Sequence, residues 1–235
     1  MEIDEFDIQE KISKIVQKRH LQISEIKTYY DRNNSQPYKN IVQLGQNLNK
    51  LETIFSKEVY KLKCENIISI TLSIGKIMDL NNSIKTILIS IKIFKEHKNY
   101  LTHLNNNDKK TFITEIFEKI KENDFEKEDS NNKLIKIISN SLVNSNKFYS
   151  RMSINFESDY SSIIYSACDI FYMLYNKMMD NICYNPNFLP YIKELDEYIY
   201  FYFIKPCYND LIKLSEFIIK NEMNQLNSSL ERFYG

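Results

Sequence analysis

The three histidines are the residues most suited to acid–base catalysis at neutral pH, and they are scattered along the sequence. His97 and His103 are six residues apart, which suits neither one face of a helix nor a pair of metal ligands. His20 stands alone. We therefore expect all three to be ordinary surface histidines.

No other spacing in the chain indicates catalysis or a metal ion. The four cysteines form no CxxC pair or other metal-binding pattern, and we expect reduced, mostly buried thiols at Cys64, Cys168, Cys183 and Cys207. There is no glycine-rich phosphate loop, no HExxH, no G-x-S-x-G, and no Arg followed by a His after four to six intervening residues. The acidic groups at 4–7 and 126–129 are typical of solvated surface. The sequence predicts a protein that is not an enzyme and needs no cofactor.

Charge and composition argue against two classes of partner, nucleic acids and membranes. Lys plus Arg equals Asp plus Glu at 31 each, and only four of the basic residues are arginines, so we expect no nucleic-acid partner. No apolar run is long enough to span a membrane, and residues 1–11 are too acidic for a signal peptide. We expect a cytoplasmic, soluble protein without a membrane partner.

The elements that must position any site are helices. Only 3 Gly and 4 Pro in 235 residues leave little material for turns. Apolar residues recur at three- and four-residue steps, which predicts an all-α, antiparallel array of about eight helices in one domain, 1–235. The expected helices are 7–29, about 37–48, about 50–78, a helix from 84 that is interrupted at 105–110 and resumes over 112–120, 133–151, 158–182, and two within 185–234, with 122–133 as a loop.

The C-terminal stretch 185–234 reads as two amphipathic helices joined by a very short turn, with Pro206 opening the second. Its aromatic run at 198–203 is too wide for a single apolar stripe. We expect that helix to bury two faces.

With these helices in hand, the sequence resembles the 14-3-3 family. Residues 185–204 fit the family's seventh helix without a gap, pairing Leu195-Asp196 with its Leu-Asn and Phe201-Tyr202 with its Tyr-Tyr. Weaker matches follow in order upstream, at 23–31, 48–61 and 116–120. The resemblance implies the family's helical array, with the last, ninth helix missing or altered.

The resemblance also implies a phosphopeptide site, with departures. Lys61 matches the family's phosphate-binding Lys, whereas its first Arg falls at Ile68 and its Arg-Tyr pair falls near Lys147-Phe148, where Tyr149 or Arg151 could serve instead. The family's backbone-holding Asn becomes Asp196, and Leu195 and Ile199 would line the apolar side. Loss of guanidinium contacts weakens phosphate binding by about tenfold to several-hundredfold.

The family pairs its first helices with the third and fourth of a partner subunit, so a homodimer or heterodimer is a further expectation. The residues implied at that interface are Ile23, Lys27, Tyr30, Ile70 and Ile74.

Three functions stay open at this point. The first is a 14-3-3-like adaptor that binds phosphoserine or phosphothreonine segments of partner proteins. The second is a helical scaffold that has lost phosphate recognition and binds unmodified proteins. The third is a membrane-bending helical crescent, which the lack of a basic face disfavours.

Overall fold

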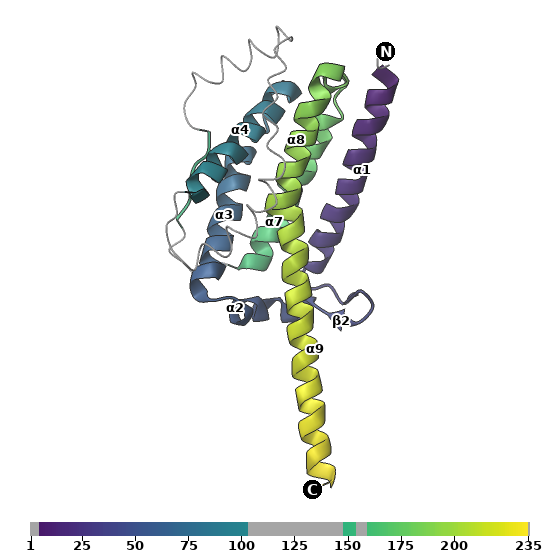
Figure 1. Cartoon of the computed structure of the whole chain (residues 1–235), viewed down its shortest axis with the longest axis vertical. Helices are drawn as coiled ribbons and strands as arrows, with labels where there is room; N and C mark the ends of the chain where they lie inside the picture. The colour runs from purple at the N-terminus through teal and green to yellow at the C-terminus, as the bar shows by residue number, and fades with distance from the viewer. Residues whose placement is uncertain (1–4, 103–147, 154–158, 235) are drawn as a thin grey trace.

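The computed structural model describes residues 5–102, 148–153 and 159–234. This part of the chain is mostly helical, as predicted, and six helices pack against one another (Figure 1). α7 contacts α1, α3 and α4, while α8 contacts α4 and α1. The helices are α1 (Glu5–Tyr29), α3 (Lys57–Gly75), α4 (Ser83–Thr102), α7 (Tyr160–Met178), α8 (Leu189–Ile199) and α9 (Lys205–Tyr234).

The apolar periodicity located α1, α4 and α7 well. The α1 stripe was predicted from Ile8, Ile12, Ile15, Ile23 and Ile26; all are buried except Ile15, which is partly buried against the core. α1 packs along α7. The helices predicted at 112–120 and 133–147, and the loop at 122–133, lie outside the described residues. Residues 148–151 were expected to end one of those helices, but they are not helical.

The helix predicted at about 37–48 is wrong. Here the chain forms a two-stranded antiparallel ribbon of β1 (Pro37–Tyr38) and β2 (Val42–Gln43), followed by a 3₁₀ helix at Gly45–Lys50. Lys39 and Asn40 turn the ribbon with φ of 49° and 60°. Two consecutive left-handed residues make the kind of turn that a tight hairpin needs, and they cannot occur inside an α-helix.

The prediction of a single helix at about 50–78 is also wrong, because this stretch forms two helices. A short α2 (Leu51–Ile54) ends where Phe55 becomes extended. Ser56 then caps α3, its side chain accepting a hydrogen bond from the Val59 N–H at 3.3 Å. A serine cap satisfies a backbone donor only at a helix start, so Ser56 marks a new beginning.

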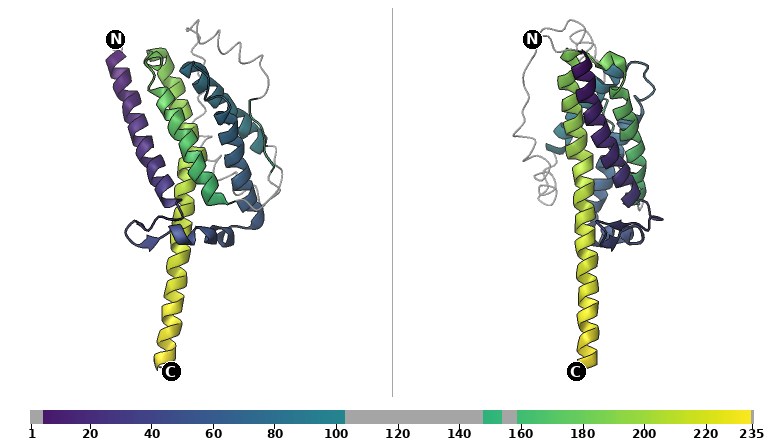
Figure 2. Two further views of the ribbon diagram at one scale, coloured as in Figure 1. Left: turned by 180° about the vertical axis from the view of Figure 1, so that it is seen from behind. Right: turned by 90° about the vertical axis from the view of Figure 1, so that its right-hand side faces the viewer.

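The two C-terminal helices predicted with a turn between them form one continuous helix (Figures 1 and 2). A π-helical segment, Tyr200–Ile204, joins α8 to α9, and the Lys205 N–H bonds to the Tyr200 carbonyl five residues back. Pro206 has no N–H to donate and its ring would clash with a carbonyl of a regular α-helix. The wider π turn accommodates the proline without a break.

The aromatic run on this helix buries two faces, as expected. Tyr198 stacks on Phe94 of α4 with ring centroids 5.5 Å apart, and Phe203 meets Phe171 of α7 at 4.5 Å. Further along, α9 packs on α1 and α2 and stays partly buried as far as Ile218, and its C-terminal part then projects alone (Figures 1 and 2).

Gly45 allows two backbone segments to approach closely. A Cβ there would lie 2.5 Å from the Asn34 carbonyl oxygen and 2.9 Å from that of Asp31. We expect Gly45→Ala to destabilise the fold by about 1–3 kcal/mol, because backbone atoms must move. Gly75→Ala is the control: its Cβ would meet only the Ile170 side chain at 3.8 Å. Urea unfolding of both variants measures the difference, and equal stabilities would show that the Gly45 contact is not tight.

Candidate functional site

The residues assigned to a phosphopeptide site lie in different surroundings. Lys61 is on the exposed side of α3, and Ile68 lies two turns further along, packed against the core. Phe148 is partly buried, and Lys147 lies outside the described residues. Leu195 and Ile199 are fully buried in α8 and form part of the core.

Asp196 is engaged with α1. Its carboxylate receives hydrogen bonds at 2.8 Å from both the Nε and an Nη of Arg19, and one at 2.6 Å from the Tyr175 hydroxyl of α7. The Arg19 guanidinium also lies 4.5 Å from the centre of the Tyr200 ring. Both members of the pair are buried. Asp196 therefore joins three helices, and its charge is neutralised there.

The residues implied at a dimer interface are also used within the chain. Ile23, Tyr30, Ile70 and Ile74 are buried in the core, and Lys27 of α1 forms an ion pair with Asp169 of α7 at 2.5 Å. A dimer through these residues stays a prediction.

Around Lys61 the structure assembles a different set of residues. Lys61, Glu65, Ser69 and Ser73 recur every four residues and form one stripe along α3, which we call the polar stripe of α3. The short segment 148–153 lies against this stripe; it is the coloured trace between two grey stretches in Figure 1.

Backbone N–H groups attach this segment to the stripe. The Ser150 N–H donates to Ser73 Oγ at 3.0 Å, and the Met152 N–H donates to Ser69 Oγ at 2.8 Å. Two residues of the segment thus span one helical turn of α3, a distance of about 6 Å that only an extended chain covers in two residues. The segment runs antiparallel to α3.

Glu96 of α4 holds the start of the same segment. One oxygen of its carboxylate accepts the N–H groups of Phe148 and Tyr149 at 3.0 and 2.8 Å. Side chains of α3 and α4 therefore accept hydrogen bonds from four backbone N–H groups of the segment, those of residues 148, 149, 150 and 152. These contacts recognise the backbone of an extended chain rather than its side chains.

Two cations meet at the Lys61 end of the stripe. Lys61 Nζ lies 3.8 Å from one oxygen of Glu65, and an Nη of Arg151 lies 3.9 Å from the other. The cation side chains are 52% and 51% exposed, whereas that of Glu65 is only 10% exposed. Both distances exceed the 2.7–2.9 Å of a strong charge-assisted hydrogen bond, so Glu65 binds neither cation tightly and another anion can compete for both.

Sequence reasoning missed most of this set. It named Lys61, and Arg151 only as a substitute for Lys147, but not Glu65, Ser69, Ser73 or Glu96. The signal available was the four-residue spacing from Lys61 to Ser73, which places a polar group on the same face of α3 at four successive turns.

His97 lies behind the segment and corrects our expectation of a surface histidine. It is 1% exposed, and its Nδ1 is 3.0 Å from the Tyr149 hydroxyl. Burial lowers the pKa of His97 to about 3 and raises that of Tyr149 to about 12. Both side chains are therefore neutral at pH 7 and act as packing groups with one hydrogen bond between them.

Beneath His97 lies a cavity of about 20 Å³ between α3, α4 and the α8–α9 helix. Asn66 and Tyr202 line it, and the Asn66 Nδ2 and the Tyr202 hydroxyl have no hydrogen-bond partner among the described residues. Lys63, which also lines the cavity, forms a buried ion pair with Asp210 at 2.9 Å. The space suits one water molecule rather than an organic ligand.

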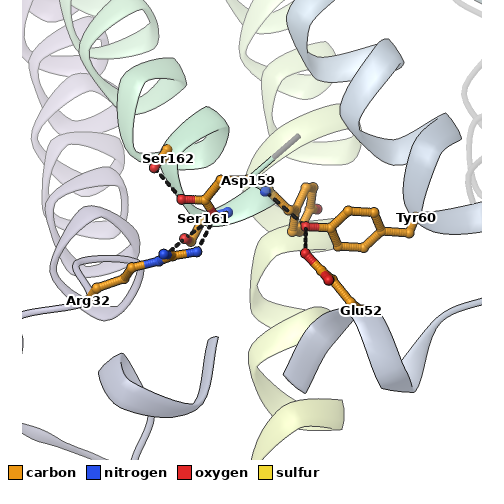
Figure 3. Close-up of polar contacts among 7 residues, drawn as sticks. Arg32, Glu52, Tyr60, Asp159, Ser161 and Ser162 are labelled. Atoms are coloured by element: carbon orange, nitrogen blue, oxygen red, sulfur yellow. Dashed lines mark hydrogen bonds and ion pairs between the residues drawn. The ribbon is translucent and has the colours of Figure 1, made fainter. Parts of the chain in front are cut away.

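A second polar cluster lies at the start of α7 (Figure 3). Asp159 caps that helix, accepting hydrogen bonds from the Ser161 and Ser162 hydroxyls at 2.6 and 2.5 Å and pairing with Arg32 at 2.8 Å. Burial raises the pKa of Asp159, but these hydrogen bonds and the Arg32 charge outweigh it and leave the pKa lowered. Nearby, the Tyr60 hydroxyl accepts the Tyr160 N–H and donates to Glu52. With every group satisfied, this cluster fastens α7 to the turn after α1 and to α3.

The cysteines are as predicted. All four are unpaired and buried, and burial raises the pKa of Cys64, Cys168 and Cys183 to about 12. Among the described residues no His, Cys, Asp and Glu side chains gather as a metal-binding group. Within the same residues no helix is long and apolar enough to cross a membrane.

No protein family model, curated protein sequence or solved structure matches the chain. A functional proposal must therefore be argued from the geometry described above.

The Arg19–Asp196 pair can be tested by removing its cation. We expect Arg19→Met to cost about 3–5 kcal/mol of unfolding free energy, because it leaves a buried carboxylate without a counter-charge. The double variant Arg19→Met/Asp196→Leu should recover much of this loss. Lys27→Met, on the same helix, breaks an exposed pair and should cost below about 1 kcal/mol. Denaturant titration of the three variants compares them; a double variant no more stable than the single one would contradict the account.

The burial of His97 predicts a pH dependence. Its pKa is about 3 when folded and near the ordinary 6.5 when unfolded, so the unfolded chain binds the extra proton between these values. Stability is then lost as the pH falls below 6.5, by about 1 kcal/mol between pH 7 and 5.5. His97→Gln should remove this part of the pH dependence of the unfolding free energy. Any contribution of His20 to that dependence is the same in the wild type and in the variant, so it cancels in the comparison. Urea titrations at the two pH values measure it, and identical slopes would show that His97 is not responsible.

Proposed function

We propose that this protein is a non-enzymatic, 14-3-3-like adaptor that binds phosphorylated segments of partner proteins at the Lys61 end of the polar stripe of α3. The observation that carries the proposal is the convergence of two exposed cations, Lys61 and Arg151, on Glu65. The resemblance of Lys61 to the phosphate-binding Lys of the 14-3-3 family supports the same assignment.

The charges at this site favour a phosphate over a carboxylate. Lys61 and Arg151 together carry two positive charges, and Glu65 cancels one of them. A phosphoserine at pH 7 carries close to two negative charges and three acceptor oxygens, so it can engage the guanidinium fork and the ammonium together. Glu65 repels the same phosphate, and we expect modest affinity.

The neighbouring contacts hold Arg151 in position. Arg151 is held in place by the backbone bonds of Ser150 and Met152, and its guanidinium lies 4.8 Å from the centre of the Tyr100 ring. One face of the guanidinium is thus packed, and it is positioned before a ligand arrives. Preorganisation of this kind reduces the entropy lost on binding.

Fluorescence anisotropy with a degenerate phosphoserine peptide library and its unphosphorylated twin tests the proposal. We expect the phosphorylated library to bind about tenfold or more tightly, and Lys61→Ala or Arg151→Ala to weaken it by about 10- to 100-fold. Glu65→Gln should strengthen binding, because it removes the competing charge. Lys76→Ala, an exposed lysine near the C-terminus of α3, is the matched control and should bind as the wild type does.

Equal affinity for the two libraries would exclude phosphate recognition and favour a second candidate, a scaffold for unmodified segments. The specific observation behind it is that the bonds to Ser69, Ser73 and Glu96 are all made by backbone N–H groups. Such bonds would be available to any extended chain that displaced residues 148–153. In that case Ser69→Ala/Ser73→Ala, and not Arg151→Ala, should change the affinity.

A further inference from the structure

The C-terminal part of α9 carries an apolar face that no other described element covers. Beyond Ile218, which is buried, the helix continues to Tyr234 and projects away from the other helices (Figures 1 and 2). Large apolar side chains recur along it at steps of four, three and four residues. These are Ile219, Met223, Leu226 and Leu230, which are 39%, 53%, 54% and 45% exposed.

This spacing is that of a coiled-coil seam. Steps alternating between four and three average 3.5 residues, which keeps the side chains on one narrow line along the helix. Ile219 and Leu226 take one of the two core positions of a heptad repeat, and Met223 and Leu230 take the other. The remaining residues of the stretch 220–232 are polar or charged. A narrow apolar line between polar flanks fits another helix better than it fits a sheet or a broad surface.

From this we infer that the apolar face of α9 is a self-association surface, on which the same face of a second copy of this chain packs antiparallel. The inference is independent of the phosphopeptide proposal, because it uses neither α3 nor segment 148–153.

The pattern is complementary to itself in the antiparallel direction. A two-fold axis between Asn224 and Gln225 sets Met223 opposite Leu226 of the second copy, and Ile219 opposite its Leu230. All four side chains of each helix are then covered by their counterparts. Such a two-fold arrangement is closed, so it ends at a dimer.

The charges flanking the face permit this register. At the flanking positions Lys220 lies opposite Asn227 of the second copy, and Glu222 lies opposite its Ser229. No like charges face each other, so the pairing carries no electrostatic penalty.

The shape of the molecule favours the antiparallel direction over the parallel one. All the other described helices lie on the N-terminal side of this stretch (Figure 1). In an antiparallel pair the packed helices of the two copies lie at opposite ends of the paired α9 segments, where they do not meet. A parallel pair would bring both bodies to the same end, side by side around the helices.

The interface is short, about two heptads, and belongs to the weak class of protein contacts. We expect a dissociation constant on the order of 10 μM. Sedimentation velocity of the full chain, from about 1 to 200 μM, should show a shift from monomer to dimer across this range.

Substitutions on two faces of the same stretch test the surface. Leu226→Glu introduces a charge into the apolar line and should weaken dimerisation by about 100-fold or more. Asn221→Glu adds the same charge on the opposite face and should leave the dimer intact. Both positions lie on the projecting part of α9, so circular dichroism should show a folded protein in each case. A wild-type chain that stays monomeric up to 200 μM, or an Asn221→Glu effect as large as that of Leu226→Glu, overturns the inference.

Cysteine cross-linking tests the direction. The four native cysteines are buried and do not compete. In the antiparallel register a mixture of Met223→Cys and Leu226→Cys chains should form the mixed disulfide, whereas each variant alone should form little, because its own cysteines are offset by about one helical turn. Rapid self-cross-linking of each variant alone would show a parallel pair and refute the proposed arrangement.

Discussion

The continuity of the helix from α8 into α9 is the constraint on which the rest of the structure depends. This helix contacts α4, α1 and α2 along its length before its C-terminal part leaves them. It stays continuous because the π turn at Tyr200–Ile204 accommodates the missing N–H and the ring of Pro206. Had the chain broken there, the buried aromatic run and the projecting end could not belong to one rigid element.

Two buried carboxylates on this helix tie it to its neighbours. Asp196 pairs with Arg19 of α1, and Asp210 pairs with Lys63 of α3, each with a tyrosine hydroxyl as an additional donor. In both ion pairs the continuous helix supplies the carboxylate and a neighbouring helix supplies the cation. Buried pairs of this kind add little net stability, but breaking one is costly, so they disfavour other packings of the same helices.

The sequence predicted the parts of the fold that rest on local periodicity. The apolar stripes of α1 and α7 were sufficient because those helices bury one face against neighbours. The same spacing located α4, although its residues 86–91 are buried on every side. The ribbon at 37–43 was not predictable in the same way, because it depends on left-handed backbone at Lys39 and Asn40, two residue types that also occur in helices. Pro206 was misleading for a related reason: a proline usually marks a helix start, and nothing in the local pattern shows that a π turn will absorb it.

The candidate site was harder to predict than the fold. Asp196 was assigned to a groove, whereas its partner Arg19 is 177 residues away and no local pattern joins them. The polar stripe of α3 was visible in the spacing of Lys61, Glu65, Ser69 and Ser73, but its meaning required the position of segment 148–153. Contacts between distant segments are set by packing, and a single sequence does not display packing.

The π turn also fixes the rotational phase of everything that follows it. Five residues in a π segment turn through roughly 80–90° less than five in an α-helix, since each bond spans one more residue. Asp196 and Asp210, 14 residues apart, would point within about 40° of each other on a regular helix. With the π turn between them they point to different neighbours, α1 and α3. The same offset sets the direction in which the apolar face of α9, with Leu226 at its middle, points relative to the other helices. A one-residue deletion within 200–204 would therefore rotate the entire projecting end about the helix axis.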